Sequence, residues 1–574
     1  MNRTWWKLLL SIISVGFFCT VGYESYAALT HKNAIIAAII IPHHDIVAKQ
    51  RKQFLNELGK KIQPKTIILI SPNHYDVGKA RIQTVDQDWN IAGGIIHSRS
   101  EVVQVLIKNG IGNEPASFPD EHGIHLVLGD IHQAFPSASL VPIIVKSSAT
   151  QLDIDNLEQI LEKTCTACLV VASVDFSHYQ PALLGDVHDE LTLRALQNLD
   201  DNALLHTAEV DSPGALLFVS KWARHANAEH FVTWMHTNSG ELLQQPDIES
   251  TTHIFGYYES GLPAGLAGKK VVSQHSVTFL LGGDLMFGRM VAHTYLQRGM
   301  AHVFDMFGDR SFWGVDAGIA NLEGPISKTP VPDDYNSKTL SFNFPPQTID
   351  ALKFLRINAA SLANNHSANA GAQGVQDTRD LLKSANVQAI GGPGDQDIPH
   401  VGMFQGEKLR LIVIGVHALY GPPNISDLIK TYKADPNNRV MIFPHWGVEY
   451  APVHNLYQAQ LAHEWIDAGA DIVIGSHPHV IQDAEVYKNK PIIYSLGNFV
   501  FDQNFSKETE EGLLVAGDFD DTGLSLFGLP IQIKNYQPIM MRGIQKKAIL
   551  DTLYAPLTKF IQHTPLGDKL FFPL

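Results

Sequence analysis

Polar side chains follow three short apolar runs between residues 441 and 502. His445 comes just after Met441-Ile442-Phe443, and His477 and His479 come just after residues 471–474; Ser495 and Asn498 follow residues 492–494. Runs of this length are typical of buried strands. Neutral imidazoles suit transition metals, so three of them on neighbouring loops form a ligand pattern. The alternative is that each histidine only satisfies its own loop, and the repetition favours a metal site.

Acidic and amide residues occupy the same kind of position earlier in the second half of the chain. Asp284 follows the apolar run 277–281, Glu323 follows 317–320, and Asn365 and His366 follow 359–363. Helical spacing between the runs, as at 374–384 and 458–468, indicates βαβ units, whose parallel strands collect such residues at their carboxyl ends. Carboxylates, an amide and imidazoles together can hold one or two divalent cations, of which Mn, Fe or Zn fit best.

The first half shows a second set at strand ends. His43 follows the run Ala34–Ile41, His74 follows Thr66–Ile70, and Asp175 and His178 follow Leu169–Val174. A helical pattern over Val47–Leu58 and a further apolar run at Leu140–Val145 again predict a largely parallel sheet. The four residues therefore predict a metal or polar ligand site at the edge of this sheet.

The C-terminal motifs carry a family resemblance. GGDLMFGR, NLEGPI, LANNH, HWGVEY, DAGADIVIGSHPHV and YSLGNFVFD resemble the CapA family of capsule (poly-γ-glutamate) biosynthesis proteins, and their order is similar to that of the calcineurin-like metallophosphoesterases. The resemblance covers roughly residues 277–550. It implies that Glu323 bridges metals, that His366 is a general acid, and that the other metal ligands are Asp284, Asn365, His445, His477 and His479.

One departure from the phosphoesterase pattern concerns the first motif. Those enzymes have Asp-x-His, whereas Asp284 is followed here by Leu285 and Met286. The loss of one ligand makes a single metal, or a weakly held second metal, the expectation. Arg289 in the same loop is expected to hold an anionic substrate group. Glu449 beside His445 is expected to contact substrate, the alternative being that it only packs its loop.

The N-terminal motifs resemble a different family. IPHHD, SPNHYD, EHGIH, SVDFSHY and MHTNSGE look like the Memo-like family, called AmmeMemoRadiSam system protein B in bacteria. That family resembles the class III extradiol dioxygenases in fold. The resemblance implies metal ligands at His43 and His74, with Asp175 and His178 as a second pair. A cysteine that completes the site in some members has no counterpart in residues 234–241, which puts thiol redox chemistry in doubt.

Length and composition bound the remaining possibilities. The chain has 574 residues, and a net charge of −15 without any long basic run excludes a nucleic-acid surface. Basic residues, an apolar run from Leu8 to Val21 and Ser25-Tyr26-Ala27 predict an export signal, with an uncleaved membrane anchor as the alternative. For an exported protein, Cys165-x-x-Cys168 indicates a disulfide or no function.

These observations predict two α/β domains, the first similar to Memo and class III dioxygenases and the second similar to metallophosphoesterases. The predicted boundaries are 1–27 for the signal or anchor, 32–260 for the first domain, 261–276 for a linker, 277–554 for the second domain and 555–574 for a tail. The expected function is an exported, metal-dependent hydrolase or transferase of the cell envelope that acts on an anionic polymer or phosphoester. The alternative is a non-catalytic polymer-binding assembly factor, with the first half oxidoreductase-like or degenerate.

Overall fold

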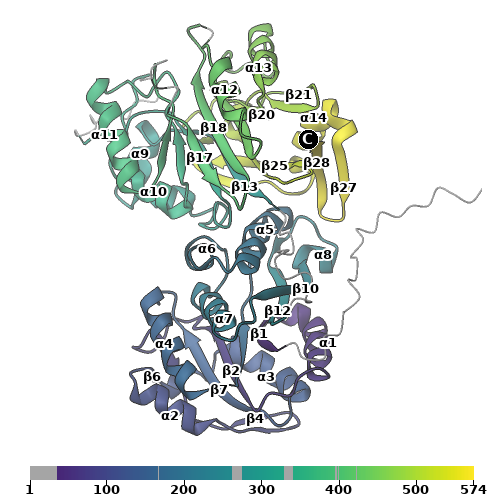
Figure 1. The fold of residues 1–574 in the computed structure, drawn as a ribbon. Coiled ribbons are helices and arrows are strands. Elements are labelled where there is room, and N and C mark those ends of the chain that lie inside the picture. The colour runs from purple at the N-terminus through teal and green to yellow at the C-terminus, as the bar shows by residue number, and fades with distance from the viewer. Residues whose placement is uncertain are drawn as a thin grey trace, which may run out of the picture.

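The chain folds into two lobes joined end to end (Figure 1). The computed structural model describes residues 35–165, 167–261, 275–328, 340–394, 397, 400–421 and 423–574. The predicted signal at 1–27 and most of the predicted linker therefore lie outside the described residues. Residues 35–261 form the N-terminal lobe and residues 275–574 form the C-terminal lobe. The α/β class and the order of two domains, predicted from the sequence, are confirmed.

The N-terminal lobe is built on an eight-stranded sheet of order β10-β12-β1-β8-β2-β7-β3-β6. Its centre is parallel and consists of β1 (Ile36–Ile41), β8 (Leu169–Ser173), β2 (Thr66–Pro72) and β7 (Ser139–Val145). One edge is closed by the antiparallel strands β12 (Thr252–Glu259) and β10 (His230–Asn238), and the other by β3 (Ile82–Thr84) and β6 (Gly112–Asn113).

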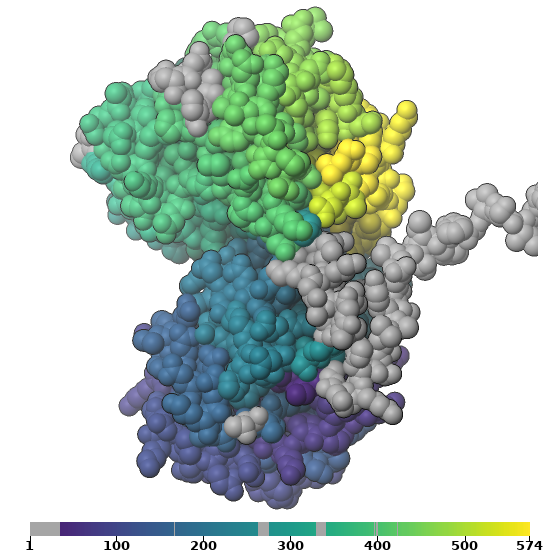
Figure 2. All heavy atoms as spheres, viewed as in Figure 1, coloured from purple at the N-terminus to yellow at the C-terminus, as the bar shows by residue number. Residues whose placement is uncertain are grey.

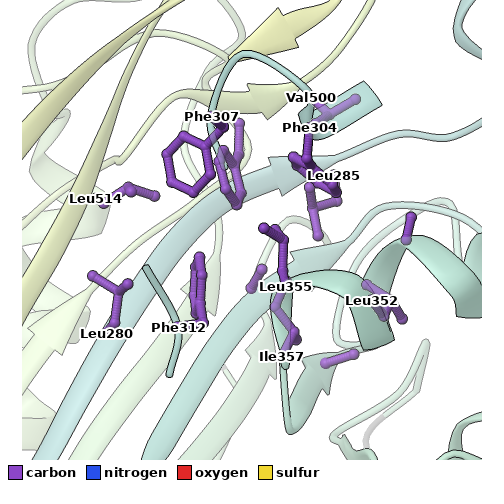
Figure 3. Packing of buried hydrophobic residues seen from close by; sticks show 14 of the residues in the cluster. Leu280, Leu285, Phe304, Phe307, Phe312, Leu352, Leu355, Ile357, Val500 and Leu514 are labelled. Atoms are coloured by element: carbon purple, nitrogen blue, oxygen red, sulfur yellow. The ribbon is translucent and has the colours of Figure 1, made fainter. Parts of the chain in front are cut away.

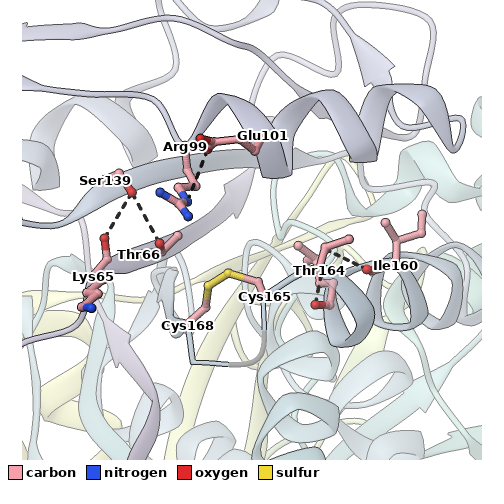
Figure 4. The surroundings of a disulfide bond; sticks show 10 residues. Lys65, Thr66, Arg99, Glu101, Ser139, Ile160, Thr164, Cys165 and Cys168 are labelled. Atoms are coloured by element: carbon pink, nitrogen blue, oxygen red, sulfur yellow. Dashed lines mark hydrogen bonds and ion pairs between the residues drawn. A yellow bond between two sulfur atoms is a disulfide. The ribbon is translucent and has the colours of Figure 1, made fainter.

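Helices cover both faces of this sheet, which is why its central strands are apolar throughout. In β1, Ile39 and Ile41 pack under α1 (Ala48–Gly59) and α3 (His122–Ala134). The alternate residues Ala38 and Ile40 pack on the other face, under α2 (Ser100–Lys108), α4 (Gln151–Thr164) and α7 (Pro213–His225). A disulfide between Cys165 and Cys168 joins the end of α4 to the start of β8 (Figure 4).

The C-terminal lobe contains two stacked sheets. In the larger sheet, β13 (Val277–Leu285), β14 (Ala317–Leu322), β15 (Ala359–Ser361) and β16 (Gln388–Ile390) are parallel, and β13 also pairs with the antiparallel β24 (Glu511–Phe519). The smaller sheet has β18 (Arg410–His417), β19 (Asn438–His445), β20 (Ile472–Ile474) and β22 (Lys490–Ile493) in parallel, with β17 (Gly402–Gln405) and β21 (Ala484–Tyr487) at its edges.

The two sheets share one core, and helices cover their outer faces. Phe279 and Ile319 of the larger sheet pack against Met441 and Ile474 of the smaller one. The outer face of the larger sheet is covered by α9 (Arg289–Tyr295), α10 (Thr348–Leu355) and α11 (Gly371–Ser384); Figure 3 shows part of this cluster. The smaller sheet is covered by α12 (Ser426–Lys433) and α13 (Leu456–Ala468).

Residues 555–574, separated above as a tail, continue this lobe. They form β27 (Ile561–Thr564) and β28 (Gly567–Pro573), and β28 pairs with β25 (Gly523–Lys534) of the larger sheet. The end of the chain is thus part of the fold.

The lobes meet through α5 (Ala182–Asn198), which belongs to the N-terminal lobe. Its apolar residues Leu183, Leu184 and Val187 join the hydrophobic cluster of the C-terminal lobe. The space-filling view shows the lobes in contact across a waist (Figure 2). Among the described residues, no helix is long and apolar enough to cross a membrane.

Candidate metal centres

The C-terminal site lies where the carboxyl ends of the two parallel strand sets meet. Asp284 lies near the end of β13, Glu323 follows β14, and Asn365 and His366 follow β15. His445 ends β19, and His477 and His479 follow β20. Because parallel strands end at one edge, residues spread over nearly 200 positions of sequence converge on one place.

The imidazoles and carboxylates of this site touch one another directly. His445 Nε2 lies 2.9 Å from Asn365 Oδ1 and 3.1 Å from His477 Nδ1. His479 lies between two carboxylates, with Nδ1 3.3 Å from Asp284 Oδ2 and Nε2 3.5 Å from Glu323 Oε1. All six residues predicted as metal ligands in this lobe are therefore brought together.

Glu323 is the buried carboxylate of this group with the weakest partners, since its nearest imidazole nitrogen, His479 Nε2, lies 3.5 Å away. Its side chain is fully buried, and neither carboxylate oxygen has a hydrogen-bond partner among the described residues. Burial raises the pKa of Glu323 well above its ordinary range, and the neighbouring charges of Asp284 and Glu449 act in the same direction, against His479. A buried carboxylate in this state is a ready ligand for a cation.

The histidines of the site have divergent proton affinities. Burial lowers the pKa of His445, as does the adjacent His477, and burial likewise lowers the pKa of His477 to about 3. Burial also acts to lower the pKa of His479, but the charges of Glu323 and Asp284 outweigh it and raise the pKa to about 9. His445 and His477 are thus neutral imidazoles at pH 7, the form that binds metals.

Glu449 belongs to the same cluster, although the sequence analysis assigned it to substrate. Its carboxylate and the rings of His477 and His479 offer ligand atoms within 4.8 Å of one another, as do Asp284, Glu323 and His445. The Tyr450 N–H donates to the Pro478 carbonyl oxygen at 2.7 Å and so ties the two loops together. Tyr450, His477 and His479 all have positive φ (63°, 100° and 57°), a strained conformation that persists where surrounding contacts fix a functional loop.

Arg289, expected to hold a substrate anion, is paired within the protein. Its guanidinium forms an ion pair with Asp502 and lies over the rings of Phe342 and Phe501, 4.9 and 5.6 Å from their centroids. An anionic substrate group would have to compete with Asp502 for it. The neighbouring Leu285 and Met286 are buried in the core, so this loop offers no ligand in place of the missing histidine.

His366, the expected general acid, lies at the side of the site. Its Nε2 is 3.9 Å from Glu323 Oε1, its Nδ1 is 2.9 Å from Asn369 Oδ1, and its ring stacks on Phe342. Burial lowers the pKa of His366, although the bond to Asn369 opposes this. At pH 7 the ring is neutral, with Nδ1–H donated to Asn369 and a lone pair on Nε2 that faces Glu323.

A second cluster lies at the carboxyl ends of β1, β2 and β8 in the N-terminal lobe. His43 Nε2 lies 3.2 Å from Asp175 Oδ2 and 3.4 Å from Asp211 Oδ2, and His74 Nε2 lies 3.6 Å from Asp211 Oδ2. Two groups here offer ligand atoms within 4.8 Å of one another: His43, Asp175 and Asp211, and His43, His74 and His122.

The N-terminal cluster compensates its own charges. His74 Nδ1 bonds Glu121 Oε1 at 2.6 Å; burial acts to lower the pKa of His74, but Asp211 and Glu121 raise it to about 9. Burial acts to raise the pKa of Asp175, yet His43 and His253 hold it well below its usual range. The carboxylates of this cluster therefore have imidazole partners already.

The structure adds residues that sequence reasoning missed and sets one predicted residue apart. Glu121 and His122 lie in the motif EHGIH, which supported the family resemblance but was not assigned a role in the site. Asp211 belongs to no motif, because it stands alone before a helix. His178 belongs to neither group of ligand atoms; its N–H donates to Glu209 at 2.8 Å.

Comparisons with known proteins agree with this division of the chain. The family model "Bacterial capsule synthesis protein PGA_cap" matches residues 278–503, and the model "Memo-like protein" matches residues 20–247. The PGA biosynthesis protein CapA of Bacillus subtilis is 30% identical over 299 residues, which cover 47% of this chain and 76% of the relative.

Two further relatives match one half each. The capsule biosynthesis protein CapA of Bacillus anthracis is 29% identical over 318 residues, 51% of this chain and 75% of that protein. A MEMO1 family protein of Caldivirga maquilingensis is 23% identical over 234 residues, 38% of this chain and 83% of that protein. The matches cover both candidate sites.

Proposed function

This chain belongs to the CapA family of capsule synthesis proteins and carries a Memo-like domain ahead of its CapA domain, and from this premise we propose its function. It is an exported protein of envelope or capsule polymer biosynthesis, of the poly-γ-glutamate type. Its C-terminal lobe holds one or two divalent metal ions and acts as a hydrolase or transferase. Its substrate is an anionic envelope polymer or a phosphoester.

The observation that carries this proposal is the state of Glu323. Glu323 is buried without a hydrogen bond, its contact with His479 is 3.5 Å long, and burial favours its protonated form, so ionising it costs free energy. Glu323 lies beside Asp284 and within ligand reach of His445, so a divalent cation would supply the charge that this carboxylate lacks. The donor set of carboxylate, imidazole and amide is one that Mn, Fe and Zn accept.

The residues around Glu323 have separable roles in such a reaction. Asp284, Glu323, Asn365, His445, His477 and His479 hold the metal. A bound divalent cation supplies Lewis acidity and neutralises charge that develops on the substrate. His366 accepts a proton on Nε2 while Asn369 fixes its ring, and only after that step can it serve as the general acid expected from the sequence.

Glu449 is assigned to the metal rather than to the substrate in this proposal. The first loop has lost a histidine ligand, and Glu449 is the carboxylate that lies near both His477 and His479. Its exposed position at the mouth of the site lets it bind a cation that enters from solvent. It therefore compensates for the missing ligand.

A second candidate function is non-catalytic. Leu285 and Met286 are buried where the phosphoesterase pattern has a ligand, and Arg289 is held by Asp502, so the site has lost one metal ligand and has no uncommitted cation in its first loop. This favours an assembly factor that uses metal to shape a polymer-binding cleft. In either case the N-terminal lobe is a second metal-binding domain, oxidoreductase-like or degenerate.

The test is the metal content of the full chain after export, measured by mass spectrometry, for the parent protein and its His445→Ala/His477→Ala variant. A His463→Ala variant is the control, because His463 stacks on Tyr487 and bonds Glu485 away from the site. The proposal expects one or two equivalents to be lost in the double variant alone. Equal metal in all three proteins would contradict it. Hydrolysis of phosphoester and γ-glutamyl substrates by the loaded parent then separates enzyme from assembly factor.

A further inference from the structure

The C-terminal lobe contacts the N-terminal lobe at residues that neighbour Asp211 and His178 in the sequence. Its residues at this contact belong to one loop, which precedes β14. The Arg310 guanidinium donates to Glu209 at 2.7 Å, the Ser311 hydroxyl donates to Gln180 at 2.9 Å, and the Gly314 N–H donates to the Thr207 carbonyl at 3.0 Å. The contact between the lobes is therefore polar and specific at this point, in addition to the apolar packing of α5.

Glu209 stands at one end of a short two-stranded ladder in the N-terminal lobe. Phe176 and Val210 form an antiparallel bridge at its centre. At one end the Asp211 N–H donates to the Asp175 carbonyl at 3.1 Å, and the Asp175 N–H donates to the Asp211 carboxylate at 2.9 Å. Asp175 and Asp211 are the two carboxylates that face His43, so this end of the ladder is the metal-ligand cluster itself.

At the other end Glu209 bonds across the ladder. Its Oε2 accepts the His178 N–H at 2.8 Å, while its Oε1 accepts Arg310. The Glu209 side chain is fully buried, and its other ionisable neighbours include His178 and His188, the latter 3.8 Å away. The carboxylate that fixes the ladder thus takes its hydrogen-bonded counter-charge from the other lobe.

We propose that Arg310 is a positioning residue for the N-terminal metal site, so that the C-terminal lobe completes the site of the N-terminal lobe. Arg310 holds Glu209 ionised and in place, Glu209 holds the backbone of His178, and the ladder between them fixes Asp175 and Asp211 opposite His43. The inference rests on the proposed metal-binding function of that cluster. This dependence would explain why the two domains are fused, because the N-terminal metal site then requires a residue of the C-terminal domain.

The same interface offers a matched control. Arg356 lies over the Trp313 ring, 3.1 Å from its centroid, and donates to the His206 carbonyl at 2.9 Å. Arg310 also packs on Trp313, 4.8 Å from its centroid. Both arginines therefore support the lobe contact through the same tryptophan, but only Arg310 bonds the ladder.

The experiment uses the full chain with the C-terminal site disabled by His445→Ala/His477→Ala, titrated with Co²⁺ as a spectroscopic probe. In this background Arg310→Ala, Arg310→Lys and Arg356→Ala are compared by Co²⁺ affinity and by the ligand-field absorption of the bound ion. We expect Arg310→Ala to weaken binding about tenfold, at the lower end of what outer-shell changes do, and to alter the spectrum. Arg310→Lys restores most of the affinity, and Arg356→Ala leaves affinity and spectrum unchanged.

Hydrogen exchange of peptides that cover residues 173–180 and 207–213 provides a second readout without metal. Faster exchange there in Arg310→Ala, and not in Arg356→Ala, supports the positioning role. Equal exchange in the two variants, or Co²⁺ affinities that match the background protein in both, would overturn it. Absence of Co²⁺ binding in the background protein itself would instead contradict the metal function of the N-terminal lobe, while the exchange comparison still decides the role of Arg310.

Discussion

The two candidate centres use the same kinds of side chain at the same place in an α/β sheet, yet they manage charge differently. In the N-terminal cluster, Asp175 and Asp211 are matched by His43, and Glu121 is matched by His74. In the C-terminal cluster, neither oxygen of the buried Glu323 has a hydrogen bond among the described residues, its contact with His479 is 3.5 Å long, and His445 and His477 have a lowered pKa. We therefore expect the metal-free state to be less favourable for the second centre than for the first.

The charge balance of a cluster affects its affinity for metal in a way that the identity of its ligands does not show. A cluster that satisfies itself must break internal ion pairs to take up metal, and that loss is subtracted from the binding free energy. A cluster whose buried carboxylate is only weakly paired loses less of that free energy on binding. We therefore expect the C-terminal site to bind a given divalent ion more tightly than the N-terminal site.

The largest expected effect is a difference between substitutions of Glu323 and Asp175. Glu323→Gln should lower Zn²⁺ affinity at the C-terminal site by about 100-fold or more, since a direct ligand matters at least as much as an outer-shell group. In the metal-free protein the same change should raise the free energy of unfolding by about 1 kcal/mol, because Glu323, with its raised pKa, must take up a proton on folding at pH 7, whereas Gln need not. Asp175→Asn should instead lower it by about 1–3 kcal/mol, because it breaks a buried ion pair. Chemical denaturation in the presence of a chelator measures the free energy of unfolding of both variants. If both are less stable than the parent protein, the proposed difference between the two centres is wrong.

A smaller effect is expected from pH. His479 and His74 each have a pKa raised to about 9 in the folded protein against 6.5 when unfolded. A raised pKa contributes stability that is present below 6.5 and is lost as pH rises toward 9, and the raised pKa of Glu323 acts in the same direction. Each of these two histidines should therefore cost the metal-free chain about 2 kcal/mol of stability between pH 7 and 9. His479→Gln should flatten the melting temperature profile; a profile that rises over this range would refute the assignment.

The smallest expected effect concerns Glu449, which is exposed and thus less costly to lose. Glu449→Ala should weaken Zn²⁺ binding at the C-terminal site about tenfold, as for a peripheral ligand. Glu464→Ala, a carboxylate of the same lobe that contacts Ser426, should leave it unchanged. If Glu449→Ala keeps full Zn²⁺ affinity but loses affinity for poly-γ-glutamate, Glu449 contacts substrate, as the sequence analysis expected.

Much of both sites could be predicted because apolar runs followed by polar residues mark the carboxyl ends of parallel strands. Asp284, His445 and His477 were placed by that rule. The same rule could not predict which side chains pair with these residues, because those contacts depend on tertiary packing. Asp502 pairs with Arg289 although the two are 213 positions apart in the sequence. No local pattern shows this ion pair, which competes with an anionic substrate for Arg289.

The contact between the domains was equally hidden. Arg310 stands in a loop with no motif, and Glu209 lies between two helices. The packing of one lobe on the other places them together. Sequence periodicity finds elements and their ends, whereas ion pairs between lobes follow from how the finished surfaces meet.

The most direct test of the central claim is a crystal structure of the full chain grown with Zn²⁺, with anomalous data collected at the zinc edge. We expect a peak at bonding distance, about 2.0–2.2 Å, from Glu323 and from His445 or His479. We also expect a weaker peak, or none, beside His43 at the same Zn²⁺ concentration. A strong peak at His43 with none at Glu323 would contradict this expectation.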